Sequence, residues 1–259
     1  MEPTIIKKRR SITHKDYKLV KPESSLTRTI VDGDFYGMTE EGYPLYVGSF
    51  NGETEELRQM LIQHPFPRES RRRGGMKDRS QVTNNVAANK AANDYCASSA
   101  FSREFPYSQD LVTEAVQSMS SWYQALYPNI YDEHLKAVSS EGSHPIREEW
   151  FIPETPFTSG IMNKKYSLEY HRDSNNLDVA PSVMLVLKNG MSGGNLVLPE
   201  YDLELKLRDN TMVIFNGGKM VHGVTPMYPN SPTAHRFSIV GYTTASMTKC
   251  GSPKEELMR

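Results

Sequence analysis

The sequence contains only two cysteines, which limits how it can be cross-linked. Cys96 and Cys250 lie far apart in the 259-residue chain and outside any C-x-x-C spacing. They predict neither a disulfide framework nor a structural zinc site, and they fit a reducing, intracellular compartment. We therefore expect an intracellular protein, in the nucleus if its source is eukaryotic and in the cytoplasm if it is bacterial or viral.

Long hydrophobic stretches are missing as well. No run of about 18 apolar residues occurs, and the first residues, MEPTIIKKRRS, lack the apolar core of a signal peptide. The sequence therefore predicts neither a membrane span nor a signal peptide. With 37% hydrophobic residues, the chain can still bury the core of one large domain.

The chain also has little net charge, formally −1, which argues against binding a polyanion over its whole surface. The basic residues are nevertheless concentrated in two segments, 1–21 and 64–90, each with seven basic residues against two acidic ones. Such runs are common on solvated tails and loops. A more specific interpretation is contact with phosphate groups, and both interpretations stay open from charge alone.

The first 150 residues have a mixed pattern. Residues 1–30 are polar and predict a basic, extended arm outside the core. Residues 31–150 predict a helical and mixed elaboration, in which the Arg-rich stretch 66–85 forms a long exposed loop, a candidate lid or clamp. The other expected elements are short strands around DFYG and YPLYVGSF, a helix over 53–63, and a helix over 108–127 with apolar residues at helical spacing.

Beyond residue 150 the pattern changes to short β-type runs separated by turn residues. Eight runs are expected as strands, namely 157–162, 165–171, 182–188, 195–199, 202–207, 211–215, 220–225 and 236–243. Closely spaced strands predict a sandwich or barrel, here over residues 151–247 and followed by a C-terminal tail, 248–259. VMLVL is typical of a strand covered on both faces, whereas Leu203, Leu205 and Leu207 alternate with charges and predict an edge or half-exposed strand. The expected fold class is α+β, with helices packed on a C-terminal β-fold.

The stretch YHRDSNN places His171 and Asp173 two residues apart before an apolar run. Alone, the pair is as compatible with polar residues at a strand end as with a metal site. Further along the chain, His222 follows the strand-like TMVIF, and Arg236 and Ser238 lie in HRFSIVGY. These residues add a third possible ligand, a cation and a hydroxyl group.

Two histidines and one carboxylate form a facial triad, which holds non-haem Fe(II) and leaves positions open for O2 and a bidentate co-substrate. Arg236 can bind the distal carboxylate of 2-oxoglutarate in a bidentate pair, and Ser238 can add a hydroxyl donor. Singly, His222 could be a core histidine, Arg236 a surface ion-pair partner and Asp173 a turn residue. Their combination favours iron and 2-oxoglutarate, since zinc hydrolysis would leave the Arg-x-Ser strand unexplained.

These motifs resemble those of a known family. His171-Arg172-Asp173 with Asn176 is similar to the H-R-D-x-x-N iron motif of TET enzymes, and FTSGIMN, GGNLVLPEY, TMVIFNGGKMVHGVTP and HRFSIVGY resemble blocks of the kinetoplastid thymine hydroxylases. The chain thus resembles the TET/JBP family of 2-oxoglutarate- and Fe(II)-dependent dioxygenases, which oxidise the 5-methyl group of pyrimidines in DNA. The resemblance runs from about Pro156 to Met247, and residues 1–150 have no clear match.

The resemblance implies a double-stranded β-helix core, the jelly-roll of cupin-like proteins, and a set of site residues. His171, Asp173 and His222 would be the iron ligands, and Arg236 with Ser238 would bind 2-oxoglutarate, with O2 as the other co-substrate. Asn176 would hydrogen-bond an extruded base on which Tyr242 stacks. The implied partner is DNA containing a 5-methylpyrimidine, and no obligate protein partner is inferred.

A methyl group inside a duplex is out of reach, so the nucleotide must be extruded and the distorted DNA held by basic segments. We therefore expect Arg71, Arg72 and Arg73 to contact DNA. The preferred reaction is hydroxylation of 5-methylcytosine to 5-hydroxymethylcytosine or beyond, because HRDxxN is closer to the TET form.

Three alternatives remain. Thymine hydroxylation in DNA is one, since Thr244 stands where animal TET enzymes use a histidine to contact cytosine, and two cysteines cannot form their zinc region. The others are a 2-oxoglutarate oxygenase acting on a protein or small molecule, and a β-barrel DNA-binding module without turnover.

Overall fold

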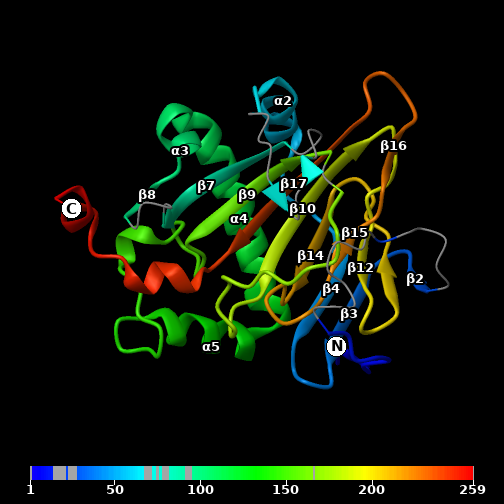
Figure 1. Ribbon diagram of the computed structural model, residues 1–259, viewed down its shortest axis with the longest axis horizontal. Coiled ribbons are helices and arrows are strands. Elements are labelled where there is room, and N and C mark those ends of the chain that lie inside the picture. Colours follow the sequence, from blue (N-terminus) through cyan, green and yellow to red (C-terminus); the bar gives the residue numbers. More distant parts are fainter. Residues whose placement is uncertain are drawn as a thin grey trace.

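A computed structural model describes the chain except residues 1, 14–21, 23–27, 67–71, 74–75, 78–81, 91–94, 166 and 259. Its main element is a nine-stranded sheet (Figure 1). In spatial order the strands are β1 (Thr4–Ile6), β3 (Phe35–Thr39), β4 (Pro44–Ser49), β14 (Thr211–Phe215), β10 (Ser182–Asn189), β17 (His235–Tyr242), β9 (Ser159–Lys164), β7 (Val82–Lys90) and β8 (Cys96–Ser98).

A second, four-stranded sheet packs against one face of the large sheet. Its order is β15 (Gly223–Val224), β12 (Leu196–Leu198), β13 (Leu203–Leu205) and β2 (Thr29–Val31). A buried apolar cluster joins the two sheets, because it includes Val47, Val186 and Val213 from the large sheet and Leu198 and Leu205 from the small one. A two-stranded antiparallel sheet of β11 (Met191–Gly193) and β16 (Met227–Pro229) lies beside them. The two sheets therefore form a β-sandwich.

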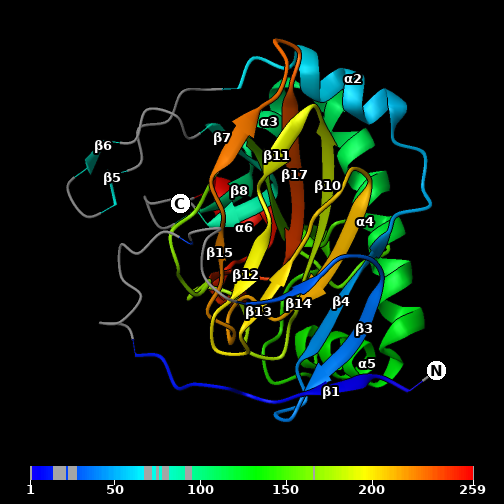
Figure 2. The ribbon, with the colours of Figure 1, turned by 90° about the vertical axis from the view of Figure 1, so that its right-hand side faces the viewer.

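Helices cover the opposite face of the large sheet (Figure 2). The long helix α4 (Pro106–Leu126) begins with proline at its first turn and buries Val112, Val116, Met119 and Tyr123 at helical spacing. The remaining helices are α2 (Glu55–Gln63), α3 (Ala100–Glu104), α5 (Pro128–Val138) and α6 (Pro253–Leu257), with short 3₁₀ turns at Glu148–Trp150 and Ala245–Lys249. The predicted helices over 53–63 and 108–127 are confirmed.

The central strand β10 lies between the two covering layers. Its residues Ser182 to Leu187 are all buried, because α4 packs on one face and the small sheet on the other. The expectation that VMLVL is covered on both faces is confirmed. Strand β13 differs from its prediction, since it is an interior strand between β12 and β2. Its charged residue Glu204 is buried beside Arg28, with Nε–Oε2 at 3.9 Å, so the alternation there does not mark an edge.

The predicted strand over 165–171 is wrong. Lys165 has a φ of 50°, which ends the extended backbone of β9. The described residues after it, up to His171, form no strand, and they join the rest of the protein by an isolated bridge at His171 and by a hydrogen bond from the Val224 N–H to the Leu168 carbonyl (2.9 Å). Residues 82–85, expected in the exposed loop 66–85, instead begin β7, which pairs with β9 in the large sheet. The short strands β5 (Arg72–Arg73) and β6 (Met76–Lys77) form a small hairpin within that stretch.

Strands from before residue 150 occur in both sheets. Strands β3, β4, β7 and β8 belong to the large sheet, and β2 pairs in parallel with β13 in the small one. Strand β1, in the expected arm, pairs in parallel with β3. The region expected as an elaboration thus supplies part of the β-sandwich itself.

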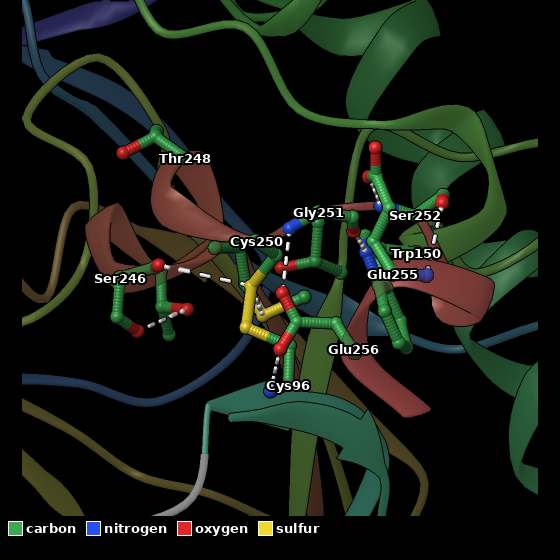
Figure 3. The surroundings of a disulfide bond; sticks show 12 residues. Cys96, Trp150, Ser246, Thr248, Cys250, Gly251, Ser252, Glu255 and Glu256 are labelled. Atoms are coloured by element: carbon green, nitrogen blue, oxygen red, sulfur yellow. Dashed lines mark hydrogen bonds between the residues drawn. A yellow bond between two sulfur atoms is a disulfide. The ribbon is translucent and has the colours of Figure 1, made fainter. Parts of the chain in front are cut away.

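Cys96 and Cys250 form a disulfide bond, so the prediction of no disulfide is wrong (Figure 3). Folding brings the two residues together although 154 positions separate them, because β8 lies at the edge of the large sheet where the C-terminal segment returns. The buried carboxylate of Glu256 accepts hydrogen bonds from the N–H groups of Cys96 (2.8 Å) and Gly251 (2.6 Å). The intracellular location is expected partly because the two cysteines predict free thiols, and the disulfide removes that support. The location stays a prediction.

No helix in the described part of the chain is long and apolar enough to span a membrane.

The disulfide closes a long loop and should stabilise the fold. We expect the double variant Cys96→Ser/Cys250→Ser to lose about 2–4 kcal/mol of unfolding free energy in urea denaturation, as is common for long loops. Dithiothreitol should lower the stability of the oxidised wild type to that of the double variant and leave the double variant unchanged. Equal stability of all four samples would contradict this expectation.

Candidate active site

The two histidines of the predicted metal site face each other across an isolated backbone bridge. The His171 N–H donates to the His222 carbonyl (2.8 Å), and the His222 N–H donates to the His171 carbonyl (2.9 Å). Directly opposed residues in such a pair send their side chains to the same side. The imidazole rings accordingly lie 4.2 Å apart between centroids.

The carboxylate of Asp173 completes the group. Its Oδ1 lies 3.4 Å from His171 Nε2, and its Oδ2 lies 3.7 Å from His222 Nε2. Each histidine Nδ1 is within hydrogen-bond distance of a backbone carbonyl, of Glu169 for His171 (2.8 Å) and of Met220 for His222 (3.0 Å). With Nδ1–H donated to these carbonyls, each Nε2 carries the lone pair that can bind a metal. The ligand atoms all lie within 4.8 Å of one another.

A glycine makes room for this carboxylate. The Asp173 N–H donates to the carbonyl of Gly217 (2.9 Å), in the turn that follows β14. A Cβ at Gly217 would overlap Asp173 Oδ2. The Asp173 carboxylate therefore lies directly against the backbone, a position that any larger residue at 217 would disturb.

The triad opens into a cavity of about 330 Å³. Its apolar lining consists of Leu168, from the segment after β9, and of residues on strands of both sheets, namely Ile161, Met184, Leu196, Phe215, Val224 and Val240. Its polar lining away from the triad consists of Asn163, Arg172, Ser174, Asn175, Asn176, Arg236, Ser238, Tyr242 and Thr244. Every site residue predicted after residue 150 therefore lines the same cavity.

Arg236 is a buried cation at this cavity. It is 1% exposed, and its Nε and Nη2 find no hydrogen-bond partner within the part of the chain that the structure describes. Burial lowers the pKa of Arg236 to about 10, so the group is still charged at neutral pH. An isolated buried charge is costly, and an anionic ligand would remove that cost. The alternative of a surface ion pair is excluded by this burial.

Glycine also makes room beside this arginine. A Cβ at Gly194 would lie 2.8 Å from Arg236 Nε, and Gly194 has a φ of 71°, which side chains rarely adopt. The guanidinium therefore packs against bare backbone.

Ser238 and Asn163 extend the polar end of the cavity. They are register partners on β17 and β9, and Asn163 Nδ2 donates to Ser238 Oγ (3.2 Å). Sequence reasoning quoted Asn163 within FTSGIMN without giving it a role. The available signal was its position, since Asn163 is a polar residue directly after the apolar pair Ile161 and Met162.

The residues expected to contact a base line the same cavity. Asn176 forms an isolated bridge with Thr244, and its Nδ2 donates to Ser182 Oγ (3.2 Å). Tyr242 reaches the cavity from the end of β17. Arg71 lies outside the described residues, and Arg72 and Arg73 are described only by their backbone in β5, so their contact with DNA stays a prediction.

The residues present fit the expected cofactors. Two imidazoles and one carboxylate on one face suit Fe(II) and leave coordination positions on the cavity side. The Nε and Nη2 donors of Arg236, which have no partner among the described residues, and the hydroxyl of Ser238, two residues along the same strand, suit the far carboxylate of a dicarboxylic acid such as 2-oxoglutarate.

A family model matches more than half of the chain. This family model, named Tet_JBP and described as the oxygenase domain of the 2OGFeDO superfamily, matches residues 84–245. The match begins well before Pro156, so the expectation of no clear match in residues 1–150 is wrong for the part from residue 84 on.

Similar proteins agree with this match. Two curated relatives from Trypanosoma brucei brucei, both named thymine dioxygenase JBP1, are 24% identical over 145 residues, which is 55% of this chain. The chain spans 17% of the length of these relatives.

Solved structures share the fold. NgTET1 in complex with 5mC DNA superimposes with a TM-score of 0.60 at 12% identity, over 91% of this chain and 90% of that one. A 2OG-Fe(II) oxygenase from Burkholderia pseudomallei gives a TM-score of 0.51 at 14% identity, over 78% and 85% of the chains. The expected α+β fold with a double-stranded β-helix core is thereby confirmed.

The role of Arg236, whose Nε and Nη2 have no partner among the described residues, can be tested by substitution. We expect Arg236→Met to weaken 2-oxoglutarate binding at least about tenfold, because a hydrogen bond to a charged group contributes about 1.5–3 kcal/mol. Metal binding should be unchanged, since Arg236 is not a ligand. The measurement is calorimetric titration of the Mn(II)-loaded protein with 2-oxoglutarate.

Arg208→Met is the matched control, because it removes an exposed arginine that pairs with Asp32. If Arg236→Met binds 2-oxoglutarate as tightly as the control does, Arg236 is not the co-substrate residue.

Proposed function

Because the chain belongs to the Tet_JBP family, the oxygenase domain of the superfamily of 2-oxoglutarate- and Fe(II)-dependent dioxygenases, we propose that it hydroxylates 5-methylcytosine in DNA. The product would be 5-hydroxymethylcytosine or a further oxidised base. The observation that carries the proposal is a single cavity lined by the triad, Arg236, Asn176 and Tyr242. In this cavity, Nε and Nη2 of Arg236 have no hydrogen-bond partner among the described residues.

The cofactors of this superfamily are Fe(II), 2-oxoglutarate and O2, and when bound they supply an oxidation coupled to decarboxylation of the 2-oxoacid. The protein holds and orients them. His171, Asp173 and His222 would bind the metal through the three atoms that converge on one point. Arg236 and Ser238 would bind the far carboxylate of 2-oxoglutarate, and the apolar lining excludes water from the reacting groups.

Asn176 and Tyr242 would recognise the base in the same cavity. A 5-methyl group can reach the metal only if its nucleotide leaves the duplex. The amide of Asn176 offers both donor and acceptor atoms to a base edge, and the ring of Tyr242 offers a stacking surface. In support, one structural neighbour is a complex with 5mC DNA, and the curated relatives are thymine dioxygenases.

Thymine in DNA is the second candidate substrate. Thr244 lines the cavity and forms an isolated backbone bridge with Asn176. A short side chain with a hydroxyl group is therefore present next to Asn176. A pyrimidine 4-oxo group accepts a hydrogen bond, and a 4-amino group donates one, so a threonine hydroxyl can serve either base. We keep 5-methylcytosine as the preferred substrate because of the HRDxxN motif.

The direct test is product analysis. The protein is incubated with Fe(II), 2-oxoglutarate and DNA that contains either 5-methylcytosine or only thymine as its methylated base, and the nucleosides are examined by mass spectrometry. We expect 5-hydroxymethylcytosine from the first DNA. His171→Ala should abolish oxidation and still bind DNA, because it removes a metal ligand only. Oxidised thymine would favour the second candidate.

A different outcome would reject DNA as the substrate. If neither DNA is oxidised while succinate forms with a protein or small-molecule substrate, the chain is an oxygenase of another substrate class.

Asn176 tests base recognition separately. We expect Asn176→Ala to lower kcat/KM for DNA about tenfold or more, since a good polar contact to a base contributes about 1–3 kcal/mol of discrimination. The KM for 2-oxoglutarate should not change, because Asn176 is not one of the residues expected to bind it. An unchanged kcat/KM for DNA would remove Asn176 from the base-binding group.

A further inference from the structure

A buried carboxylate lies directly behind the metal centre. Glu200, in the turn between β12 and β13, is 1% exposed and is not one of the residues that line the cavity. Buried carboxylates are rare unless they are paired and hydrogen-bonded. The identity of its partners indicates what it does.

The Glu200 side chain binds both segments that carry the metal ligands. From one segment, Arg172 Nη2 donates to Oε1 (3.0 Å) and Oε2 (3.2 Å). From the other, the Val221 N–H donates to Oε2 (3.0 Å). Arg172 stands between His171 and Asp173 in the sequence, and Val221 directly precedes His222. One carboxylate therefore ties together the neighbours of all three ligands.

The N-terminal segment docks on the same residue. Lys8 Nζ lies 3.1 Å from Glu200 Oε1, and the N–H groups of Arg9 (2.8 Å) and Arg10 (3.2 Å) donate to the Glu200 carbonyl. The side chains of Lys8 and Arg172 are both 37% exposed, so solvent screens both ion pairs, whereas the Val221 N–H contact is buried. The basic arm thus supplies a second cation beside Arg172 and covers Glu200 from outside.

We propose that Glu200 is a positioning residue for the metal centre, which holds the His171–Asp173 segment and the His222 segment at the separation that metal binding needs. Backbone hydrogen bonds already join the two segments at the His171–His222 bridge and, on one side of it, between the Val224 N–H and the Leu168 carbonyl (2.9 Å). The Glu200 contacts with Arg172 and Val221 add a side-chain link on the other side of the bridge. Outer contacts of this kind are commonly worth about 10–100-fold in metal affinity.

The test replaces the carboxylate by its amide. Glu200→Gln keeps the side-chain size, but its amide nitrogen cannot accept from Val221 or Arg172. We expect its Kd for Mn(II), measured by electron paramagnetic resonance of the free ion, to rise about 10–100-fold. In turnover assays, the Fe(II) concentration for half-maximal rate should rise by a similar factor, and kcat at saturating Fe(II) should change much less.

The matched control is the same substitution at another buried glutamate. Glu256 is 6% exposed and accepts backbone hydrogen bonds from Cys96 and Gly251 next to the disulfide, away from the metal ligands (Figure 3). Glu256→Gln should lower the thermal unfolding temperature but leave the Kd for Mn(II) unchanged. If both variants lose metal affinity equally, or if Glu200→Gln binds Mn(II) like the wild type, the proposal is wrong.

A double-mutant cycle shows whether the effect passes through Arg172. If Glu200 acts partly through this arginine, the combined Glu200→Gln/Arg172→Met variant should lose less Mn(II) affinity than the two single losses multiplied. Strict multiplication would contradict that part of the proposal. The measurements need no DNA, so they can fail or succeed independently of the proposed substrate.

Discussion

Two backbone hydrogen bonds, one in each direction between His171 and His222, hold the proposed metal site together. They join the irregular segment around His171 to the residue that directly precedes β15 of the small sheet. They also turn both imidazoles to the same side. Asp173 then reaches the same point because Gly217 leaves space for its carboxylate. The geometry of the site thus depends on backbone pairing, and the carbonyls of Glu169 and Met220 set the orientation of the rings.

The β-sandwich supplies the other half of the site, a buried position for the guanidinium group of Arg236. Strand β17 lies next to the central strand β10 in the large sheet, so Arg236 is buried and its pKa is lowered, although the group stays charged. With Nε and Nη2 unpaired among the described residues, the free protein carries an electrostatic cost that an anionic co-substrate would relieve. Stability and function are opposed here, as is common at ligand sites.

Much of this site could be predicted from the sequence, because its chemistry lies in short motifs on or beside strands. Periodicity also predicted α4 and β10, whose patterns are local. Long-range contacts were not predictable. The Cys96–Cys250 disulfide joins distant segments. Glu204 alternates with leucines as an exposed residue would, but it is buried because β2 pairs with β13. Glu200 carries no local signal, since its role appears only when Arg172 and Val221 meet on its carboxylate.

The most direct test of this account is a spectroscopic titration of the anaerobic Fe(II) protein with 2-oxoglutarate. A co-substrate that chelates the metal while Arg236 holds its far carboxylate should give a visible charge-transfer absorption that saturates at one equivalent. His222→Ala should show no such absorption, because one of its three ligands is gone. If the wild-type protein takes up Fe(II) but 2-oxoglutarate produces no absorption change, the three residues do not form the centre described here.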